Sequence, residues 1–446
     1  MLPDTLSRPA AITLDEYRGR REALMAKLPD GAALIVPGAS LTIRSNDSEY
    51  PFRQQSDFYY LTGINEPDAL LLLLPGRVAG QSVVFCQDRD PTMEAWTGRR
   101  LGAEGVMAEH GIDQAFENAE RDDYLPAMLE SRTLLYAPLD HPEAQSIAEE
   151  ALAQAQRGQR RGKPMLKGWL DSRELIHDMR LIKSPAELAL LRHACRISAR
   201  AHCRAMRTCA PGLFEYQLQA ELEHEFLWHG GSGPAYSTIV GGGANACVLH
   251  YIENGDVLKE NALVLIDAGA EFDLYAGDIT RTFPVSGRFS DAQRVLYEVV
   301  LGAQERAVAA VAPGATLADI HAGVVEDLTR GLIELGLLEG EVQARIDDES
   351  YRRFYLHSTS HWLGLDVHDV GTYRLDEQTP RALSPGMVGT VEPGLYIPND
   401  DDLPAAYRGI GIRIEDNVVV SETGGEILTS DVPKRIDEIE ALMAKK

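Results

Sequence analysis

The sequence is poor in cysteine, lacks any long hydrophobic run and carries little positive charge for its size. Its five cysteines are odd in number and form no CxxC pair, which argues against a disulfide framework and a structural zinc site. The longest apolar runs, such as residues 69–74, are far shorter than the roughly 20 residues of a membrane-spanning helix. The first residues contain no apolar stretch typical of a signal peptide. We therefore expect a cytoplasmic protein that does not enter a membrane.

Basic residues number 43 and acidic residues 68 among the 446, which gives a net charge of −25 at pH 7. A surface of this sign repels nucleic-acid phosphates and anionic lipids, and this argues against both as partners. Motifs of several enzyme classes are also missing. The triplet Gly241-Gly242-Gly243 lacks the strand and helix context of a dinucleotide site, and the sequence has no Walker A motif and no GxSxG motif.

The first part of the chain alternates between helical and strand-like patterns. Residues 14–28 have the apolar spacing of an amphipathic helix. Short apolar segments typical of strands follow at residues 32–37, 69–74, 82–87 and 133–137. The alternation predicts an α/β domain over residues 1–179. Residues 154–167 are polar, basic and glycine-containing, which predicts an exposed loop near the end of this domain.

The second part, residues 180–446, has helices followed by strands, and this order occurs twice. Ser184 with Glu187 forms a capping box that predicts a helix to about residue 209. A second helix is expected at 214–228, and Ser290 and Thr316 are expected to cap two more, ending near residues 312 and 335. Strand-like segments lie at 237–240, 247–251, 263–268, 274–285, 362–367, 387–397 and 411–420. The pattern predicts an α+β domain with an internal pseudo-duplication. The helical histidines His202, His224 and His229 are expected to be structural.

Four acidic residues and one histidine occupy apolar segments of this second domain. Asp267 directly follows an apolar run, Asp278 lies in the string GDITRTFP, and Glu392 and Glu415 stand within strand-like segments; His361 lies in HSTSHWLGLDVHD. If a hairpin turns at residues 272–273, Asp267 and Asp278 are directly opposite, with Cβ atoms about 4.5–5.5 Å apart. Alternation along a strand places Arg413 on the same face as Glu415.

Each of these residues also has a structural interpretation. An aspartate after an apolar strand is commonly a turn or cap residue, Arg413 and Glu415 could form a simple ion pair, and a single histidine is commonly a hydrogen-bonded core residue. Five such residues in one half of the chain favour a metal site instead. Oxygen and nitrogen donors without thiolate favour Mn²⁺, Co²⁺ or Zn²⁺. Four carboxylates carry a charge that two divalent ions balance, so we expect two metals.

The order Asp267, Asp278, His361, Glu392, Glu415 resembles the metal-ligand set of the M24 metallopeptidases, whose fold is called pita-bread. The strings LIDAG, GDITRTFP, SHWLGLDVHDVG, TVEPGLYI and YRGIGIRIED resemble in particular the bacterial Xaa-Pro aminopeptidase (aminopeptidase P) branch of this family. The strings RSNDSEYPFRQQSDFYYLTG and NEPDALLLL near the N-terminus are similar as well. The resemblance spans nearly the whole chain. It implies a creatinase-like N-terminal α/β domain over residues 1–179 and a pita-bread catalytic domain over residues 180–446.

The resemblance implies a dimetal aminopeptidase that hydrolyses the N-terminal Xaa-Pro bond of peptides, with a metal-bridging hydroxide as the nucleophile. In this family pattern Asp267 binds one metal, Asp278 and Glu415 bridge both, and His361 and Glu392 complete the shell of the other. Glu392 is further implied to act as general base and then acid. The implied cofactor is a pair of divalent ions, with Mn²⁺ preferred over Co²⁺ or Zn²⁺.

The same resemblance implies contacts with a peptide that has proline at its second position. His250 and His368 match histidines that contact the substrate and stabilise the tetrahedral intermediate, and His357 matches a histidine near the leaving proline side. Arg413 and Tyr373 match family residues that surround the site. Asp47 and Trp96 match family residues that line the substrate entrance across a contact between subunits. Ser358 departs from the family pattern, in which glycine is commoner, and this concerns the shape of the pocket near His357.

Two other functions share this fold. Prolidase has the same ligands and prefers Xaa-Pro dipeptides, and a catalytically silent pita-bread domain could serve as a binding module. The quoted strings are more similar to the aminopeptidase, and silent relatives usually lose ligands, whereas all five positions are filled here. Relatives form dimers and tetramers, so the resemblance also implies a homo-oligomer.

Overall fold

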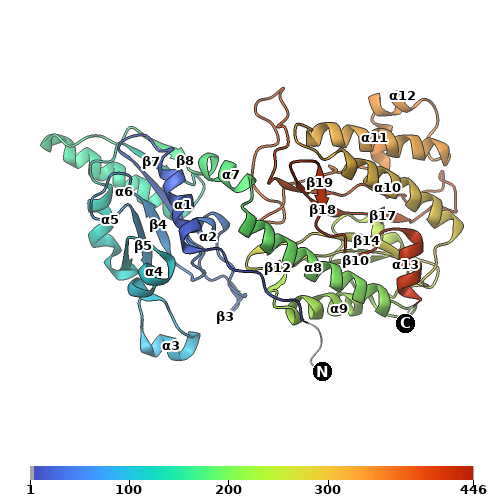
Figure 1. The fold of residues 1–446 in the computed structure, drawn as a ribbon, viewed down its shortest axis with the longest axis horizontal. Coiled ribbons are helices and arrows are strands. Elements are labelled where there is room, and N and C mark those ends of the chain that lie inside the picture. The colour runs from blue at the N-terminus through green and yellow to red at the C-terminus, as the bar shows by residue number, and fades with distance from the viewer. Residues whose placement is uncertain (1–4, 445–446) are drawn as a thin grey trace. The chain divides into compact units, whose positions relative to one another are not determined.

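The computed structural model describes residues 5–444 and divides into two compact units (Figure 1). One unit comprises Ala11–Arg180, and the other comprises Leu181–Lys446 together with Met1–Ala10. The described part of that N-terminal segment is held to the C-terminal unit, because Leu6 N donates to His229 Nδ1 at 3.3 Å and Arg8 pairs with Asp273 at 2.9 Å. No helix within residues 5–444 is long and apolar enough to cross a membrane.

The N-terminal unit is built on a six-stranded sheet with the strand order β6-β5-β4-β1-β7-β8. Strands β1, β4 and β5 are buried along their whole length, as expected for continuous apolar segments covered on both faces. β4 runs antiparallel to both β1 and β5, and the other neighbours are parallel. The strands are β1 (Ala32–Pro37), β2 (Ile43–Ser45), β3 (Ser48–Glu49), β4 (Leu70–Leu73), β5 (Ser82–Cys86), β6 (Gln114–Glu117), β7 (Leu134–Ala137) and β8 (Gly168–Asp171). The helices are α1 (Leu14–Met25), α2 (Ser56–Thr62), α3 (Pro91–Thr97), α4 (Gly102–His110), α5 (Arg121–Leu129), α6 (Pro142–Gly158) and α7 (Arg173–Leu181).

The C-terminal unit contains two packed helix pairs, α8 with α9 and α10 with α11, each followed by antiparallel strands (Figure 1). Its sheets have the orders β10-β11-β14, β13-β12-β9, β15-β18-β19 and β16-β17. The helices are α8 (Pro185–Thr208), α9 (Glu215–Trp228), α10 (Asp291–Ala310), α11 (Leu317–Glu334), α12 (Val342–Asp347) and α13 (Ile436–Met443). The strands are β9 (Gly233–Pro234), β10 (Ile239–Gly242), β11 (Leu263–Asp267), β12 (Ala270–Phe272), β13 (Tyr275–Ala276), β14 (Thr280–Pro284), β15 (Val388–Val391), β16 (Gly394–Tyr396), β17 (Gly411–Arg413), β18 (Asp416–Val420) and β19 (Gly425–Ile427).

The capping signals of the sequence are present in the structure. Ser184 Oγ accepts from Glu187 N at 3.2 Å, and Glu187 Oε2 accepts from Ser184 N at 2.9 Å. The same reciprocal bonds join Ser290 and Gln293 at the start of α10, and Thr316 Oγ1 accepts from the N–H of Asp319 at the start of α11. The predictions of these three helices are confirmed, and the side-chain caps satisfy backbone donors that the first helical turn leaves free. The helix expected at 214–228 is confirmed as well, as α9.

Four of the predicted local structures differ from the structure. Residues 247–251 are not a strand but continue from a short 3₁₀ turn; Leu249 and His250 line a cavity, and Cys247, Leu249 and Tyr251 pack against a buried apolar cluster. Residues 362–367 form a loop with a single bridge from Trp362 to Gly389, although Trp362, Leu363 and Leu365 are buried. The segment 274–285 is split into β13 and β14. The predicted loop at 154–167 begins inside α6, which continues to Gly158.

The hairpin that carries Asp267 has a different register from the predicted one. Asp267 of β11 pairs with Thr280 of β14, so Asp267 and Asp278 are not directly opposite one another. The chain turns one residue later than expected, at Asp273 and Leu274, which both have positive φ (46° and 66°). Two consecutive left-handed residues form the turn that matches the twist of a two-residue hairpin.

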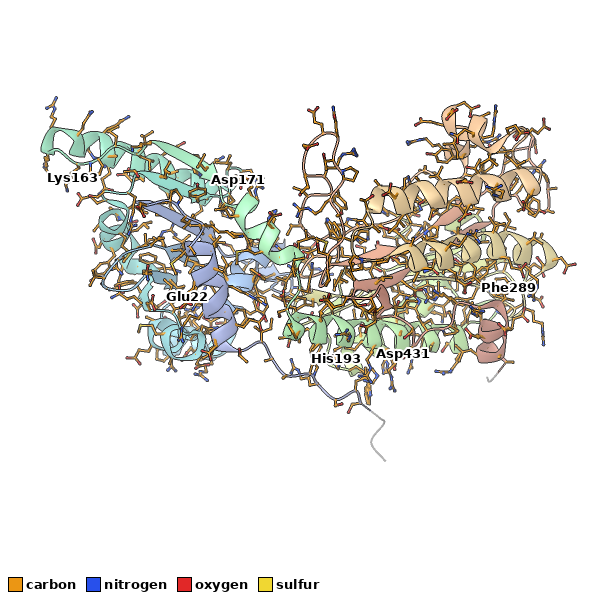
Figure 2. The ribbon with its side chains drawn as sticks, turned by 45° about the horizontal axis from the view of Figure 1, so that its top comes forward. Glu22, Lys163, Asp171, His193, Phe289 and Asp431 are labelled. Atoms are coloured by element: carbon orange, nitrogen blue, oxygen red, sulfur yellow. The ribbon has the colours of Figure 1, made fainter. Side chains whose placement is uncertain are left out.

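Ionic groups tie the last strands and the C-terminal segment to the two long helices α8 and α10. Buried Asp416, at the start of β18, pairs with Arg281 at 2.7 Å and with Lys434 at 2.6 Å, and accepts a hydrogen bond from Gln304 of α10 at 2.9 Å. Burial raises the pKa of Asp416, but Arg281 and Lys434 bring it far below its usual range. Asp431 lies beside α8 (Figure 2), where its Oδ2 is 3.9 Å from Arg196 Nε.

Candidate metal centre

A cavity of about 1010 Å³ in the C-terminal unit collects most of the residues selected from the sequence. All five predicted metal ligands line it, as do the other predicted residues of this unit: His250, His357, His368, Tyr373 and Arg413. Ser358 is part of the lining too. Asp47 and Trp96 are exposed residues of the N-terminal unit and are not among the lining residues.

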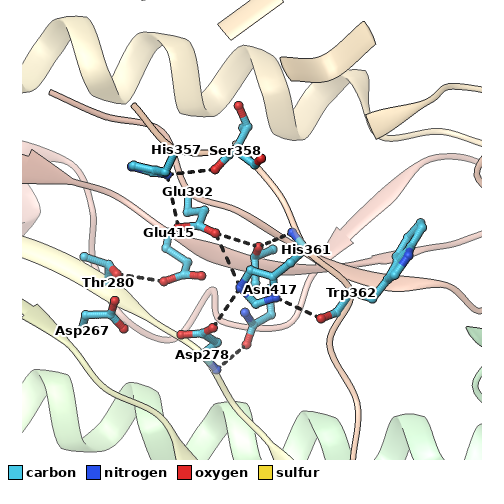
Figure 3. Close-up of polar contacts among 12 residues, drawn as sticks. Asp267, Asp278, Thr280, His357, Ser358, His361, Trp362, Glu392, Glu415 and Asn417 are labelled. Atoms are coloured by element: carbon cyan, nitrogen blue, oxygen red, sulfur yellow. Dashed lines mark hydrogen bonds and ion pairs between the residues drawn. The ribbon is translucent and has the colours of Figure 1, made fainter. Parts of the chain in front are cut away.

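The four carboxylates reach the cavity from the ends of strands. Asp267 is the last residue of β11, Asp278 precedes β14, Glu392 follows β15, and Glu415 lies between β17 and β18. Backbone hydrogen bonds hold two of these residues, because Glu415 N donates to Thr280 O of β14 at 3.0 Å and Glu392 N donates to Thr359 O at 2.8 Å. Strand ends allow side chains from distant parts of the sequence to converge while their backbones stay in hydrogen-bonded sheets (Figure 3).

His361 joins these carboxylates in a geometry suited to a metal ion. Ligand atoms of Asp278, His361 and Glu415 all lie within 4.8 Å of one another. His361 Nε2 is 3.4 Å from Asp278 Oδ2 and 3.5 Å from Glu392 Oε1 (Figure 3). The other ring nitrogen, Nδ1, lies 2.9 Å from the carbonyl oxygen of Trp362 and can only donate to it. When the ring is neutral, as metal ligation requires, the lone pair of Nε2 points at the carboxylates.

Tyr236 joins Asp267 to Asp278, and Arg413 holds Asp267 from the other side. The hydroxyl of Tyr236 lies 2.6 Å from Asp267 Oδ1 and 2.5 Å from Asp278 Oδ1. Arg413 donates from NH2 to Asp267 Oδ2 at 2.6 Å and from Nε to Thr280 Oγ1 at 3.1 Å. Thr280 Oγ1 in turn donates to Glu415 Oε2 at 2.8 Å. Three of the four predicted carboxylate ligands, Asp267, Asp278 and Glu415, thus have a hydrogen-bond partner that fixes their orientation.

The protein alone does not balance the charge of these four acids. Burial, together with the charges of Asp278 and Asp267, raises the pKa of Glu392 to about 8. Burial and the charges of Asp278 and Glu392 hold the pKa of Glu415 well above its usual range. Burial lowers the pKa of His361, but its contact with Asp278 and the charge of Glu392 raise it to about 9. Buried acids that repel one another are stabilised by cations, so the donor set fits divalent metal ions.

Sequence comparisons agree with this site. The family model for Metallopeptidase family M24 matches residues 189–422, and the model for the aminopeptidase P N-terminal domain matches residues 17–136. The chain belongs to metallopeptidase family M24. It is 47% identical over 434 residues to the Xaa-Pro aminopeptidase of Escherichia coli K12, covering 97% of this chain and 98% of that protein. It is 45% identical over 439 residues to the Xaa-Pro aminopeptidase of Haemophilus influenzae, covering 98% and 99%.

Solved structures of this family have the same fold. The aminopeptidase PepP of Pseudomonas aeruginosa superposes with a TM-score of 0.95 at 47% identity, covering 98% of this chain and 99% of that chain. A zinc-substituted E. coli aminopeptidase P in complex with product gives a TM-score of 0.94 at 46% identity over the same shares of the two chains. The predictions of an α/β N-terminal domain and a pita-bread C-terminal domain are confirmed. M24 members are metal-dependent, in keeping with the donor cluster described above.

The three further histidines that line the cavity differ in hydrogen bonding, in pKa and in exposure. His357 Nδ1 donates to Ser358 O at 2.8 Å, so Nε2 accepts from the hydroxyl of Tyr396 at 2.8 Å. Burial and the charge of Arg413 lower the pKa of His357 to about 4, which makes the ring neutral at pH 7. The ring of His368 is 4.3 Å from that of His361, and burial with the charge of His361 lowers its pKa. His250 is exposed at the cavity wall.

Three hydroxyl-bearing residues of the site were missed by the sequence analysis. Tyr236 contacts two candidate ligands, Thr280 donates to a third, and Tyr396 connects Arg413 NH1 (2.9 Å) with His357. Thr280 and Tyr396 lie in the quoted strings GDITRTFP and TVEPGLYI, whose polar residues at alternate strand positions were a usable signal. Tyr236 precedes β10 outside any such string, and nothing in its local sequence distinguishes it from an ordinary core tyrosine.

Proposed function

We propose that this chain is an Xaa-Pro aminopeptidase, a hydrolase that releases the first residue of peptides with proline at the second position. The observation that carries the proposal is the convergence of four carboxylates, two buried and two half-buried, and His361 on one large cavity. Nearly the whole chain aligns with proteins named Xaa-Pro aminopeptidase, which supports the same activity over that of a dipeptidase.

The residues present would hold two divalent ions. We assign Asp267 to one ion, Asp278 and Glu415 to both, and His361 with Glu392 to the other. The absence of cysteine among these donors and the presence of a single imidazole favour Mn²⁺, with Co²⁺ or Zn²⁺ as alternatives. The arrangement of partners supports this assignment, because Arg413 and Thr280 orient carboxylates that lie on the strand ends.

Bound divalent ions supply Lewis acidity, which lowers the pKa of water and polarises a carbonyl group. The protein supplies the proton transfers. Glu392 lies 3.5 Å from His361 and 3.8 Å from His357, and we assign it to accept the proton of the attacking water and to return it to the leaving proline nitrogen. His250, His357 and His368 surround the same space and are assigned to binding the substrate and the tetrahedral intermediate.

The cavity also suits the substrate class. An Xaa-Pro bond is a tertiary amide without an N–H on the proline side, so an enzyme for it cannot depend on a hydrogen bond to that group. Leu249, Ile252 and Val367 line the same cavity and offer apolar contact to a proline ring or to the first side chain. Tyr373, stacked on Trp362 with ring centroids 5.4 Å apart, gives the wall near His361 a fixed shape.

The decisive experiment compares two substrates on one metal-loaded preparation. The chain is stripped with a chelator, reloaded with Mn²⁺, and assayed for kcat/KM on an Xaa-Pro-Yaa tripeptide and on the matching Xaa-Pro dipeptide. We expect faster cleavage of the tripeptide, with release of the first residue. Preference for the dipeptide would indicate a prolidase, and metal binding without cleavage of either peptide would contradict the proposal.

The assignments of Asp47 and Trp96 to the substrate entrance, of a homo-oligomer and of a cytoplasmic location stay predictions. Asp47 and Trp96 can be tested together by the variant Asp47→Ala, Trp96→Ala. This variant should raise KM for the tripeptide if the two residues contribute to a shared entrance, and light scattering on the same samples gives the number of chains per particle.

A further inference from the structure

The charges that line the large cavity are unevenly distributed. Its acidic residues are the four candidate ligands, and within residues 5–444 its only lining arginines are Arg413 and Arg374. Arg413 is buried and fully engaged with Asp267, Thr280 and Tyr396. Arg374 is exposed, and among the described residues it forms no ion pair. The cavity therefore combines an acidic interior with one uncommitted guanidinium.

Arg374 is presented by a short, well-braced hairpin that projects from the C-terminal unit (Figure 1). Arg374 forms a bridge with Pro380, Leu375 N donates to Thr379 O at 2.9 Å, and Arg381 N donates to Tyr373 O at 2.9 Å. At the base of the hairpin the Tyr373 hydroxyl accepts from Trp362 N at 3.2 Å, which ties it to the loop of His361.

Asp376, the acid of the hairpin on which the charge of Arg374 acts, already has hydrogen-bond partners. The carboxylate of Asp376 accepts from Gln378 N at 2.9 Å, from Thr379 N at 2.8 Å and from Thr379 Oγ1 at 2.9 Å. These bonds and the charge of Arg374 lower the pKa of Asp376, so it stays ionised without closing an ion pair on the arginine. The hairpin thus fixes its own acid in the turn and leaves the five donors of Arg374 available to a ligand.

We propose that Arg374 binds the C-terminal carboxylate of short peptide substrates and so makes this cavity selective for peptides with a free C-terminus. The inference rests on the proposed function and extends it from the reacting bond to the far end of the substrate. A short peptide carries an ammonium group at the end to be cleaved and a carboxylate at the other. The end to be cleaved lies at the candidate metal centre, and a planar guanidinium at the wall matches the carboxylate at the other end with paired hydrogen bonds.

Pairing of Arg374 with the C-terminal carboxylate should strengthen substrate binding and should not change the rate of the chemical step. An exposed arginine contacts only the distal carboxylate, so its contribution appears in KM and falls with ionic strength. A peptide amide of the same sequence keeps every contact except this one. Substrates that differ only in acid or amide termini therefore isolate the contribution of Arg374.

The test measures kcat and KM on Xaa-Pro-Yaa and on peptides longer by one and by two residues, each as free acid and as amide. We expect the parent to prefer the acid at one or more lengths by about fivefold or more, through KM, as is typical of a charge-assisted contact discounted for exposure. Arg374→Ala should remove this preference and leave the amides unchanged, and Arg374→Lys should keep part of it. Calorimetry with the matching product peptides should show the same loss of affinity for the acid.

Arg207→Ala serves as the matched control, because Arg207 is also an exposed arginine of the C-terminal unit and does not line this cavity. It should leave the acid preference intact. Equal cleavage of acid and amide peptides by the parent at all three lengths would overturn the inference and leave the proposed function standing. An equal loss of kcat/KM on acid and amide peptides in Arg374→Ala would do the same. If the metal-loaded parent cleaves none of the peptides, the proposed function fails and this inference fails with it.

Discussion

Arg413 NH2 donates a hydrogen bond to Asp267 Oδ2 at 2.6 Å and so links the last residue of β17 to the last residue of β11, 146 positions earlier in the chain. The arginine is 3% exposed, and its NH1 and Nε donate to Tyr396 and Thr280. Burial lowers the pKa of Arg413, but Tyr396 and Asp267 hold it well above the usual range, so the side chain is a permanent cation. It is a positioning residue for a candidate ligand.

Replacing Arg413 by lysine should weaken metal binding. Arg413→Lys keeps the positive charge but cannot hold Asp267, Tyr396 and Thr280 at once, so the change isolates the loss of orientation. Partners of metal ligands typically contribute about 10- to 100-fold to metal affinity or activity, and we expect a loss in that range. Calorimetric titration of the chelator-stripped protein with Mn²⁺ measures it. Arg192→Lys is the control, since Arg192 makes a similar forked contact with exposed Glu426 outside the cavity. Equal affinities of parent and Arg413→Lys would refute the role.

Metal loading should release protons at pH 7. Without metal, the pKa of Glu392 is about 8 and that of His361 about 9, so both groups carry a proton at neutral pH. A ligand must lose that proton to bind a metal, so affinity should increase as the pH rises from 6 to 8. Calorimetric titrations at pH 7 in two buffers with different ionisation enthalpies should give different heats, corresponding to about one proton or more per site. Identical heats in the two buffers would show that these groups are already deprotonated.

The variant Asp278→Asn should lose turnover and bind metal more weakly. Asp278 is 4% exposed and lies 3.4 Å from His361, and it is assigned to both ions. Removing its charge should lower metal affinity by more than the roughly 10- to 100-fold attributed to an outer partner. Asp401→Asn, at a fully exposed side chain, should behave as the parent. Normal activity in Asp278→Asn would exclude the dimetal assignment.

A stability measurement on the same variant separates a lost ligand from misfolding. In the metal-free protein Asp278 stabilises the protonated ring of His361 and raises the pKa of both Glu392 and Glu415. Asp278→Asn removes the first effect and relieves the second, so the two changes in the free energy of unfolding oppose one another. The metal-free variant should therefore unfold at a temperature close to that of the metal-free parent, and a clearly lower temperature would attribute the loss of activity to the fold.

The sequence predicted the members of the site better than their geometry. Asp267, Glu392 and Glu415 stood out because acids are costly in apolar strands unless they have a partner, and the structure places them in one cavity. The register of the hairpin could not be predicted from composition. Leu274 adopts a left-handed conformation that is unfavourable for a branched side chain, so no turn signal marked residues 273–274.

Residues 362–367 show a second limit of local pattern analysis. Their alternating apolar residues are buried, as in a strand, but the segment is a loop whose backbone bonds are made singly, for example from Leu363 N to Val388 O at 3.0 Å. The loop is held from outside by the buried pair of Lys183 and Asp369 at 2.9 Å. Such long-range contacts determine the conformation of the His361 segment, and they leave no periodicity in the sequence.

His202 is buried in α8 directly behind the site. Its Nε2 lies 2.9 Å from the carbonyl oxygen of Ala268, the residue after Asp267, and its Nδ1 has no hydrogen-bond partner within the described residues. Burial lowers the pKa of His202 to about 4. The folded state therefore keeps this ring neutral, whereas the unfolded chain protonates it near pH 6.5. Between these two values the unfolded state binds more protons, so the stabilising contribution of neutral His202 is complete above pH 6.5 and is lost as the pH falls towards 4.

Urea unfolding of the metal-free protein between pH 7 and pH 4.5 should show this contribution. His202→Gln keeps an N–H for Ala268 O and cannot titrate, so its free energy of unfolding should fall less steeply with decreasing pH. The lowering of the His202 pKa from 6.5 to about 4 corresponds to about 3 kcal/mol of unfolding free energy between these two pH values. His224→Gln is the control, because His224 is half exposed on α9 and should leave the slope unchanged. Parallel curves for the parent and His202→Gln would mean that His202 is protonated in the folded protein, and the carbonyl of Ala268 would then have to stabilise a buried cation next to the metal centre.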